Sequence, residues 1–343
     1  MPRYHLLMLH GLSFSPHGLL LLLAALAGVA VALAAAAAVL MAQILLRPPR
    51  MTDGKAAYVL RRLSPGDLRL PFEELRWTVR DARSGQPLDL AAWWIPHPRA
   101  EGRTIVLIHG YADAKVGSIA WAPALHATGL NLLALDLRAH GESGGRYSTA
   151  GYFERHDVDQ AINQLQSQRP QDAKKVALFG ASMGAAVAAA TACVRGDVVG
   201  VVMECPYRDY ATAARRHATG QGFPAGLLQG AATRLAELFS GANFAEVAPV
   251  RLIPQVPCPL MLIQACDDFY VSPEDAAALV NAAESRPAES STVIWRIDAA
   301  THLRGMCLEP LAYQKRLEEF LIGCFERTGQ APQGNRKVMK PAP

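Results

Sequence analysis

The stretch Gly180-Ala181-Ser182-Met183-Gly184 decides the fold, because of the segments on either side of it. Before it lies Lys175–Phe179, a short apolar run typical of a strand, and after it lies Ala185–Ala192, a run of small residues typical of a helix. A strand that breaks into a helix through G-x-S-x-G forms a nucleophile elbow, in which the glycines permit a tight turn that lifts the serine hydroxyl above the sheet edge. The pattern predicts a nucleophilic Ser182, with a glycine-rich turn and a surface serine as the alternative.

Short apolar runs alternate with helical segments through most of the chain. We expect strands at 73–80, 88–95, 104–108, 131–135, 175–179, 198–204, 260–264 and 292–297, and helices at 118–127, 154–168, 183–193, 227–239, 273–283 and 310–325. Such alternation predicts an α/β fold with a mostly parallel central sheet and helices on both of its faces. The expected domain covers residues 66–326. Residues 206–250 lack strong strand runs, so they form either an inserted lid or a plain layer of connecting helices.

The amino-terminal segment is the second strong feature. Residues 18–46 carry a single polar side chain, Gln43, and would form a helix of about 43 Å, longer than the ~30 Å hydrocarbon core of a bilayer. Cleaved signal peptides carry shorter apolar stretches, of about 7–15 residues. The segment predicts an uncleaved transmembrane anchor, with a signal peptide as the alternative because small-x-small sites occur in it. Residues 1–17 would then be a tail, 47–65 a linker, and 327–343 a disordered tail.

Basic residues are distributed unequally around this segment. Arg3 is the only Lys or Arg before it, whereas the linker that follows contains a cluster of basic residues: Arg47, Arg50, Lys55, Arg61 and Arg62. Lys and Arg accumulate on the cytoplasmic side of membrane spans, so the sequence predicts a single-pass protein with its large carboxy-terminal domain in the cytoplasm.

Overall charge and cysteine spacing exclude several classes of function. The 343 residues carry a net charge of +4, which is too small to indicate nucleic-acid binding. The six cysteines are scattered, with no C-x-x-C pair and no metal-ligand spacing. We therefore expect buried free thiols, no nucleic-acid partner, and no metal or diffusible cofactor.

A serine hydroxyl becomes a good nucleophile when a histidine accepts its proton and a carboxylate orients that histidine. Among the ten histidines, His302 follows the last expected strand, and sites of parallel sheets form at the carboxyl ends of strands. The acid is expected between Ser182 and His302 in chain order. Asp267 and Asp268 follow the strand at 260–264 and are the best placed, while Asp298 lies too close to His302 along the chain.

These segments together resemble the α/β-hydrolase superfamily, and within it the serine hydrolases of the serine-aminopeptidase-like and esterase/monoacylglycerol-lipase-like group. The resemblance covers about residues 70–326. Besides the Ser182 elbow, it depends on Ile108-His109-Gly110-Tyr111, on Asp136–Ser143, on Asp268-Phe269-Tyr270-Val271 and on Thr301-His302. The motifs indicate the fold and serine catalysis, and they say little about the substrate.

The resemblance also implies roles for individual residues. In this family the acid stands three residues before a valine, so Asp268, with Val271, is the implied member of the triad. The oxyanion hole is implied to consist of the backbone N–H groups of Tyr111 and Met183. His109 and His140 are implied to brace loops by hydrogen bonding.

Three expectations concern residues around these motifs. Arg138 and Glu142 are expected to face solvent, with pairing to neighbouring residues as the alternative. Many relatives carry a His-Gly pair before the acid, where this chain has Gln264-Ala265-Cys266, and this departure weakens any narrower assignment. We expect Cys266 to be a buried spectator, because no helix terminus or cation is evident to lower its pKa.

The sequence thus predicts a membrane-anchored serine hydrolase that cleaves a carboxylic ester, thioester or amide through an acyl-enzyme. The expected catalytic residues are Ser182, Asp268 and His302, and the expected substrate is a small-molecule or lipid acyl compound. An acyltransferase with the same triad is one alternative. A non-catalytic, membrane-tethered interaction protein on the same fold is another.

Overall fold

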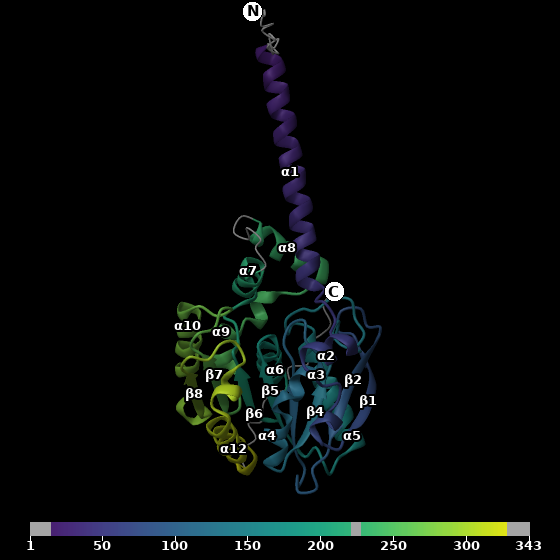
Figure 1. Cartoon of the computed structure of the whole chain (residues 1–343), viewed down its shortest axis with the longest axis vertical. Coiled ribbons are helices and arrows are strands. Elements are labelled where there is room, and N and C mark those ends of the chain that lie inside the picture. Colours follow the sequence, from purple (N-terminus) through teal and green to yellow (C-terminus); the bar gives the residue numbers. More distant parts are fainter. Residues whose placement is uncertain (1–14, 221–227, 328–343) are drawn as a thin grey trace, which may run out of the picture.

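The centre of the molecule is one eight-stranded sheet, with the strand order β1-β2-β4-β3-β5-β6-β7-β8 (Figure 1). The computed structural model describes residues 15–220 and 228–327. The strands are β1 (Glu73–Arg80), β2 (Pro87–Ile95), β3 (Arg103–Ile108), β4 (Asn131–Leu135), β5 (Lys175–Ala181), β6 (Val198–Glu204), β7 (Leu260–Ala265) and β8 (Thr292–Ile297). Each lies where the apolar runs of the sequence predict it.

Most of the sheet is parallel. β2 pairs antiparallel with β1 and with β4, whereas every other neighbouring pair, from β4 to β8, is parallel. Parallel strands are buried on both faces, which explains their almost continuous apolar sequences. In β5, Val176 and Leu178 point into the core on one face of the sheet, and Ala177 and Phe179 point into the core on the other. The predicted α/β class, with a mostly parallel sheet, is confirmed.

Helices cover both faces of the sheet. The α-helices are α1 (Pro16–Leu46), α2 (Asp53–Val59), α3 (Lys115–Ser118), α4 (Ala122–Ala127), α5 (Glu154–Gln168), α6 (Met183–Val194), α7 (Tyr210–Gly220), α8 (Gln229–Ser240), α9 (Pro249–Leu252), α10 (Pro273–Glu284), α11 (Gly305–Leu308) and α12 (Pro310–Glu326). α5, α6 and α10 contribute to the core on one face, and α4 and α12 to the core on the other. The helix expected at 118–127 is divided into α3, a 3-10 turn and α4, because Pro123 starts a new helix.

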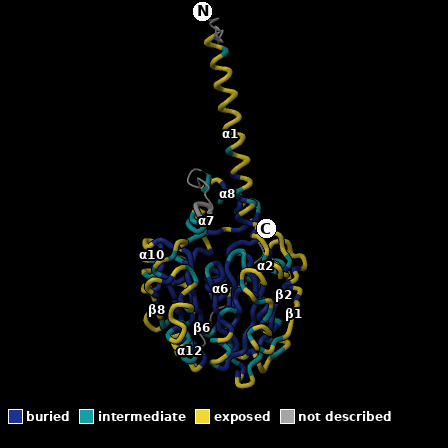
Figure 2. The backbone as a smooth tube through the Cα atoms, viewed as in Figure 1, coloured by how far each residue is buried: buried dark blue, intermediate teal, exposed yellow. Residues whose placement is uncertain are grey.

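α1 projects from the rest of the molecule as one long helix (Figure 1). It begins at Pro16, where the side chain of Ser15 accepts a hydrogen bond from the N–H of Gly18. It is exposed over most of its length and buried only near its end, where it packs against α8 (Figure 2). The buried residues are Ala38, Ala42, Leu45 and Leu46. Within the described residues, α1 is the helix long and apolar enough to cross a membrane.

The segment 206–250 contains α7, α8 and α9 and no strand in its described part. α7 and α8 lie beside the base of α1 (Figure 1). Residues 221–227 of the expected lid, residues 1–14 of the expected amino-terminal tail and residues 328–343 of the expected carboxy-terminal tail lie outside the described residues.

Candidate active site

The site forms at the carboxyl ends of β3 and β5, which are neighbours in the sheet. Ile108, the last residue of β3, is paired with Gly180 near the end of β5. The chain leaves β3 toward β4 on one side and leaves β5 toward β6 on the other. Loops that diverge in this way open a crevice at the carboxyl ends of the strands, where ligands bind in open α/β sheets.

Ser182 stands in a strained turn between β5 and α6. Its φ is 53° and its ψ is −115°, a conformation that non-glycine residues seldom adopt. The two glycines of the motif are needed because neighbouring backbone approaches them closely, and neither has a positive φ. A methyl group at Gly180 would overlap the carbonyl of Gly184, and one at Gly184 would overlap the carbonyl of Ile108 in β3. The motif therefore lets α6 begin directly against the central strands.

The turn is hydrogen-bonded to β6 and leads directly into α6. The N–H of Ser182 donates to the carbonyl of Glu204 at the end of β6, at 2.8 Å. Met183 is the first residue of α6, so its N–H is one of the helix-start donors that have no partner inside the helix. The amino terminus of a helix carries a partial positive charge, which favours an anion placed there.

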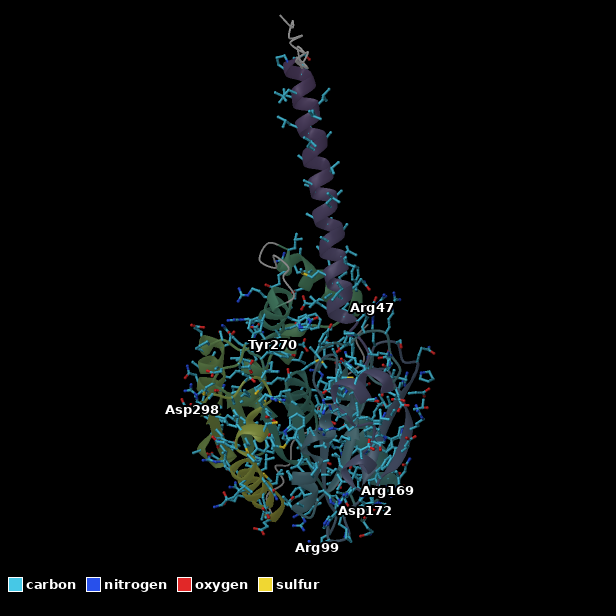
Figure 3. All side chains as sticks on the ribbon, viewed as in Figure 1. Arg47, Arg99, Arg169, Asp172, Tyr270 and Asp298 are labelled. Atoms are coloured by element: carbon cyan, nitrogen blue, oxygen red, sulfur yellow. The ribbon has the colours of Figure 1, made fainter. Side chains whose placement is uncertain are left out.

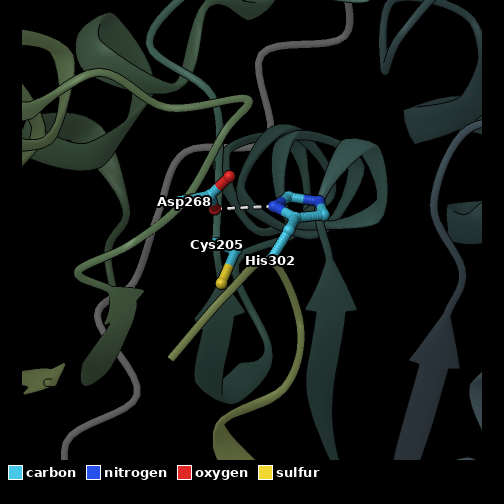
Figure 4. A group of neighbouring side chains, drawn as sticks. All are labelled: Cys205, Asp268 and His302. Carbon is cyan, nitrogen blue, oxygen red and sulfur yellow. Dashed lines mark hydrogen bonds and ion pairs between the residues drawn. The ribbon is translucent and has the colours of Figure 1, made fainter. Parts of the chain in front are cut away.

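Asp268 and His302 are brought together from two loops. Asp268 follows β7, His302 follows β8, and the imidazole Nδ1 lies 2.6 Å from the carboxylate Oδ2 (Figure 4). The other carboxylate oxygen of Asp268 accepts the N–H of Tyr270 at 2.8 Å. The side chain of Asp268 is only 2% exposed, whereas Asp267 and Asp298 are exposed residues. Of the three aspartates considered from the sequence, Asp268 is the one that contacts His302.

Ser182 and His302 line the same pocket, together with Tyr111 and Met183. Its volume is about 260 Å³. Most of the other lining side chains are apolar or aromatic: Leu45, Ala150, Tyr207, Tyr210, Ala213, Ala214, Tyr270, Val271 and Leu303. Such a pocket accommodates an apolar group next to the serine and the imidazole.

The loop that carries Tyr111 is fixed by His109. The Nε2 atom of His109 accepts the N–H of Leu137 at 3.0 Å, so Nδ1 carries the proton and donates to the carbonyl of Gly110 at 2.8 Å. The imidazole thus joins the ends of β3 and β4. Burial raises the pKa of the Tyr111 phenol to about 12, and its hydroxyl donates to the carbonyl of Ile44.

His140 also braces a loop by hydrogen bonding. It is buried, its Nδ1 lies 2.9 Å from the carbonyl of Arg138, and its ring meets that of His109 edge to face. Burial lowers the pKa of His140 to about 3, so the imidazole is neutral.

The expectation that Arg138 and Glu142 face solvent is wrong for Arg138. Its guanidinium is buried and makes two hydrogen bonds to the carboxylate of Asp157, at 2.5 and 2.7 Å, and one to Asp81. The side chain of Glu142 is half exposed, as expected, but it pairs with Lys115 and Arg76. Through the contact with Asp157, Arg138 connects the loop after β4 to α5.

The sequence did not single out Cys205, which follows β6. Its sulfur and the nearest atoms of Asp268 and His302 lie within 4.8 Å of one another, a grouping that could in principle hold a metal ion (Figure 4). Burial and neighbouring carboxylates raise the pKa of the Cys205 thiol well above its usual value, which opposes the thiolate that metals need. His302 already uses Nδ1 for Asp268. The donor set therefore fits a hydrogen-bonded pair beside a neutral thiol.

Cys266 is half-buried rather than fully buried, and burial raises the pKa of its thiol, so it is no activated nucleophile.

The sequence also missed Leu45, Tyr210 and His217 as pocket residues. Leu45 belongs to a helix that is apolar on every side, and α7 carries no catalytic motif. Only the rule that sites form at the carboxyl ends of strands could have drawn attention to Glu204 and Cys205.

Comparisons with known proteins agree with this geometry. The family model described as "Serine aminopeptidase, S33" matches residues 99–228. YqkD, an uncharacterized protein of Bacillus subtilis, is 24% identical over 262 residues, which cover 75% of this chain and 83% of YqkD. YfhR, an uncharacterized protein of Escherichia coli K12, is 28% identical over 189 residues, which cover 53% of this chain and 60% of YfhR.

Solved structures give the same result over a longer part of the chain. An esterase from Pyrococcus furiosus superposes with a TM-score of 0.63 at 26% identity, covering 81% of this chain and 97% of the esterase. An acylaminoacyl peptidase from Pyrococcus horikoshii, at 15% identity and a TM-score of 0.54, shares the fold. The sheet order, the elbow at Ser182 and these matches lead to one conclusion: the chain has the α/β-hydrolase fold.

Proposed function

We propose that the protein is a membrane-anchored serine hydrolase that cleaves carboxylic esters through an acyl-enzyme, with Ser182, Asp268 and His302 as its triad. The observation that carries the proposal is the 2.6 Å contact between His302 Nδ1 and Asp268 Oδ2, beside a pocket that His302 shares with Ser182. A carboxylate at Nδ1 fixes the imidazole so that Nε2 is the atom that accepts a proton.

In the proposed reaction, the oxygen of Ser182 attacks the ester carbonyl while His302 takes the hydroxyl proton. The resulting oxyanion is bound by the backbone N–H groups of Tyr111 and Met183. His302 then protonates the departing alcohol, which leaves Ser182 acylated. Water, deprotonated by His302, attacks the acyl-enzyme and releases the carboxylic acid. Each preformed N–H donor contributes about 3–4 kcal/mol to lowering the barrier.

Two observations favour an ester over a peptide as the substrate. The pocket beside Ser182 is lined mainly by apolar and aromatic side chains. Among the described residues of its lining, Asp113 is the one with a carboxyl group. Of the two solved structures described above, the one with the higher TM-score is an esterase.

Membrane attachment through α1 is the third part of the proposal. About 22 residues of α1, up to the first buried alanine, are available to a bilayer, and they would span about 33 Å. This length matches the ~30 Å hydrocarbon core. The basic residues that follow α1 favour a cytoplasmic position for the catalytic domain.

A fluorophosphonate probe tests the proposal, because it labels an activated serine and ignores an ordinary one. The full chain in detergent is expected to be labelled, and Ser182→Ala is expected to abolish labelling without changing the melting temperature. A panel of p-nitrophenyl esters and aminoacyl amides then separates esterase from amidase activity. A folded wild-type chain that never labels would favour the non-catalytic interaction protein.

A further inference from the structure

The end of α1 is fixed to the catalytic domain by three successive backbone carbonyls. The carbonyl of Ile44 accepts the hydroxyl of Tyr111 at 2.9 Å, that of Leu45 accepts the hydroxyl of Tyr210 at 3.4 Å, and that of Leu46 accepts the N–H of Ser148 at 2.8 Å. The last carbonyls of a helix have no partner of their own inside it. Here the catalytic domain satisfies them, so α1 ends as part of the domain rather than as a flexible tether.

The residues that follow α1 strengthen this attachment. The guanidinium of Arg50 donates to the carbonyls of His140, Gly141 and Ser143, at 3.2, 2.7 and 2.6 Å. These carbonyls belong to the loop after β4, which His109 connects to the loop carrying Tyr111. The chain is therefore held on both sides of Pro48-Pro49, and the direction in which α1 leaves the domain is fixed.

The side chain of Leu45 lies in the wall of the pocket that contains Ser182 and His302. It is 8% exposed, whereas Leu40, on the same helix, is 62% exposed. Ala213 and Ala214 of α7 and Tyr210 line the pocket with it. A helix that leads toward a membrane thus ends as one side of the candidate substrate site.

Leu45 lies just beyond the part of α1 that is available to a bilayer. It follows Ala37, the last residue before the first buried alanine of α1, by eight residues, which is about 12 Å along the helix axis. This distance exceeds the headgroup region on one side of a bilayer, which is about 5–8 Å thick, so the pocket lies at the water-facing side of the headgroups. Tyr270 lines the pocket and lies at the end of the molecule from which α1 emerges, as does Arg47, whereas Arg99 lies at the opposite end (Figure 3). Phe269 packs edge to face on Tyr270 and is 55% exposed.

We propose that Leu45 contacts the acyl chain of the substrate, and that the substrate is a long-chain lipid ester taken from the bilayer surface. This proposal rests on the hydrolase function proposed above. The acyl chain lies against Leu45 and the alanines of α7, and the ester reaches Ser182 at the floor of the pocket. Tyrosine side chains are enriched at membrane interfaces, which suits a pocket that Tyr270 lines beside the headgroup layer.

The test uses the full chain in vesicles of phosphatidylethanolamine and phosphatidylglycerol. The readout is the ratio of kcat/KM for p-nitrophenyl palmitate to kcat/KM for p-nitrophenyl butyrate. Leu45→Trp narrows the pocket and is expected to lower this ratio at least tenfold, whereas Leu45→Ala is expected to keep or raise it. Leu40→Trp, the same substitution at an exposed position of α1, serves as the control and is expected to leave the ratio unchanged.

The ratio is independent of how much enzyme is folded, because both substrates report on the same preparation. An unchanged ratio in Leu45→Trp would overturn the proposal, and so would a wild-type enzyme that prefers butyrate to every longer ester. Both outcomes leave the hydrolase function standing, since they require an active enzyme. If the wild type hydrolyses neither ester and fluorophosphonate leaves it unlabelled, the hydrolase function fails and the assignment of Leu45 fails with it.

Discussion

At the residue scale, the motif around Ser182 predicts the turn, whereas the structure shows which of its residues adopts the unusual backbone conformation. The motif predicts a tight turn, and the structure has one, but the positive φ falls on the serine while the glycines make room for neighbouring backbone. The choice between Asp267 and Asp268 illustrates a limit of sequence reasoning. Consecutive side chains on a loop point in different directions, so only the fold reveals that Asp268 contacts His302.

Glu204 is a buried acid directly below the elbow. Its Oε2 accepts the hydroxyl of Tyr313 at 2.5 Å, and its Oε1 is buried with no hydrogen-bond partner among the described residues. Burial raises the pKa of the Glu204 carboxyl from 4.5 to about 7. Such a carboxyl holds its proton more tightly in the folded state than in the unfolded state. Its contribution to stability is therefore complete below about pH 4.5 and is lost as the pH rises through about 7.

We predict that Glu204→Gln removes this pH dependence. Glutamine keeps an oxygen for the hydroxyl of Tyr313 and cannot ionise. Between pH 5 and pH 8 the unfolding free energy of the variant should improve relative to wild type by about 2–3 kcal/mol. Melting curves in detergent at several pH values measure this difference, and the subtraction removes other titrating groups such as His140. A difference that stays constant with pH would mean that Glu204 is ionised in the folded protein.

At the scale of elements, the strands were predictable because buried parallel strands have nearly continuous apolar sequences. β4 and β8 have the predicted bounds, and β5 extends by two residues into the elbow. α7 was missed because Tyr210–Gly220 consists mainly of polar and small residues and contains few large apolar side chains. The docking of α1 on α8 was also beyond the sequence. A helix that is apolar all round carries no stripe to indicate which side packs.

Arg138 joins three elements by charge: the loop after β4, α5 through Asp157, and the turn between β1 and β2 through Asp81. We predict that Arg138→Met lowers the unfolding free energy by about 3–5 kcal/mol, because it leaves the fully buried carboxylate of Asp157 without its partner. Denaturant titration of the full chain in detergent measures the loss.

The exposed pair between Arg76 and Glu142 provides the matched control. Both side chains are more than half exposed, so Arg76→Met should change the unfolding free energy by no more than about 1 kcal/mol. Equal effects of the two substitutions would show that the buried contacts of Arg138 contribute no more than a surface ion pair does.

At the scale of the whole molecule, the end of α1 and the pocket lie at the carboxyl ends of the parallel strands, where Arg50 of the basic linker binds the loop after β4. Pocket residues come from α1, from the loops after β3, β4, β5, β6, β7 and β8, from the start of α6 and from α7. No single segment of the sequence contains this pocket, and local motifs therefore named its candidate polar residues but not its apolar wall. The arrangement gives the molecule one face that points along α1 and an opposite face that includes Arg99 (Figure 3).

Cys307 allows the orientation of this face to be measured. It is the exposed cysteine among the six, on α11 of the α/β domain. Because basic residues follow α1 and only Arg3 precedes it, we predict that the domain lies in the cytoplasm. A membrane-impermeant maleimide should then label the protein in bacterial spheroplasts only after the inner membrane is permeabilised. Cys307→Ser should remove the label, since the other thiols are buried or half-buried. Labelling of intact spheroplasts that depends on Cys307 would place the catalytic domain outside and would show that the charge of the linker does not set its orientation.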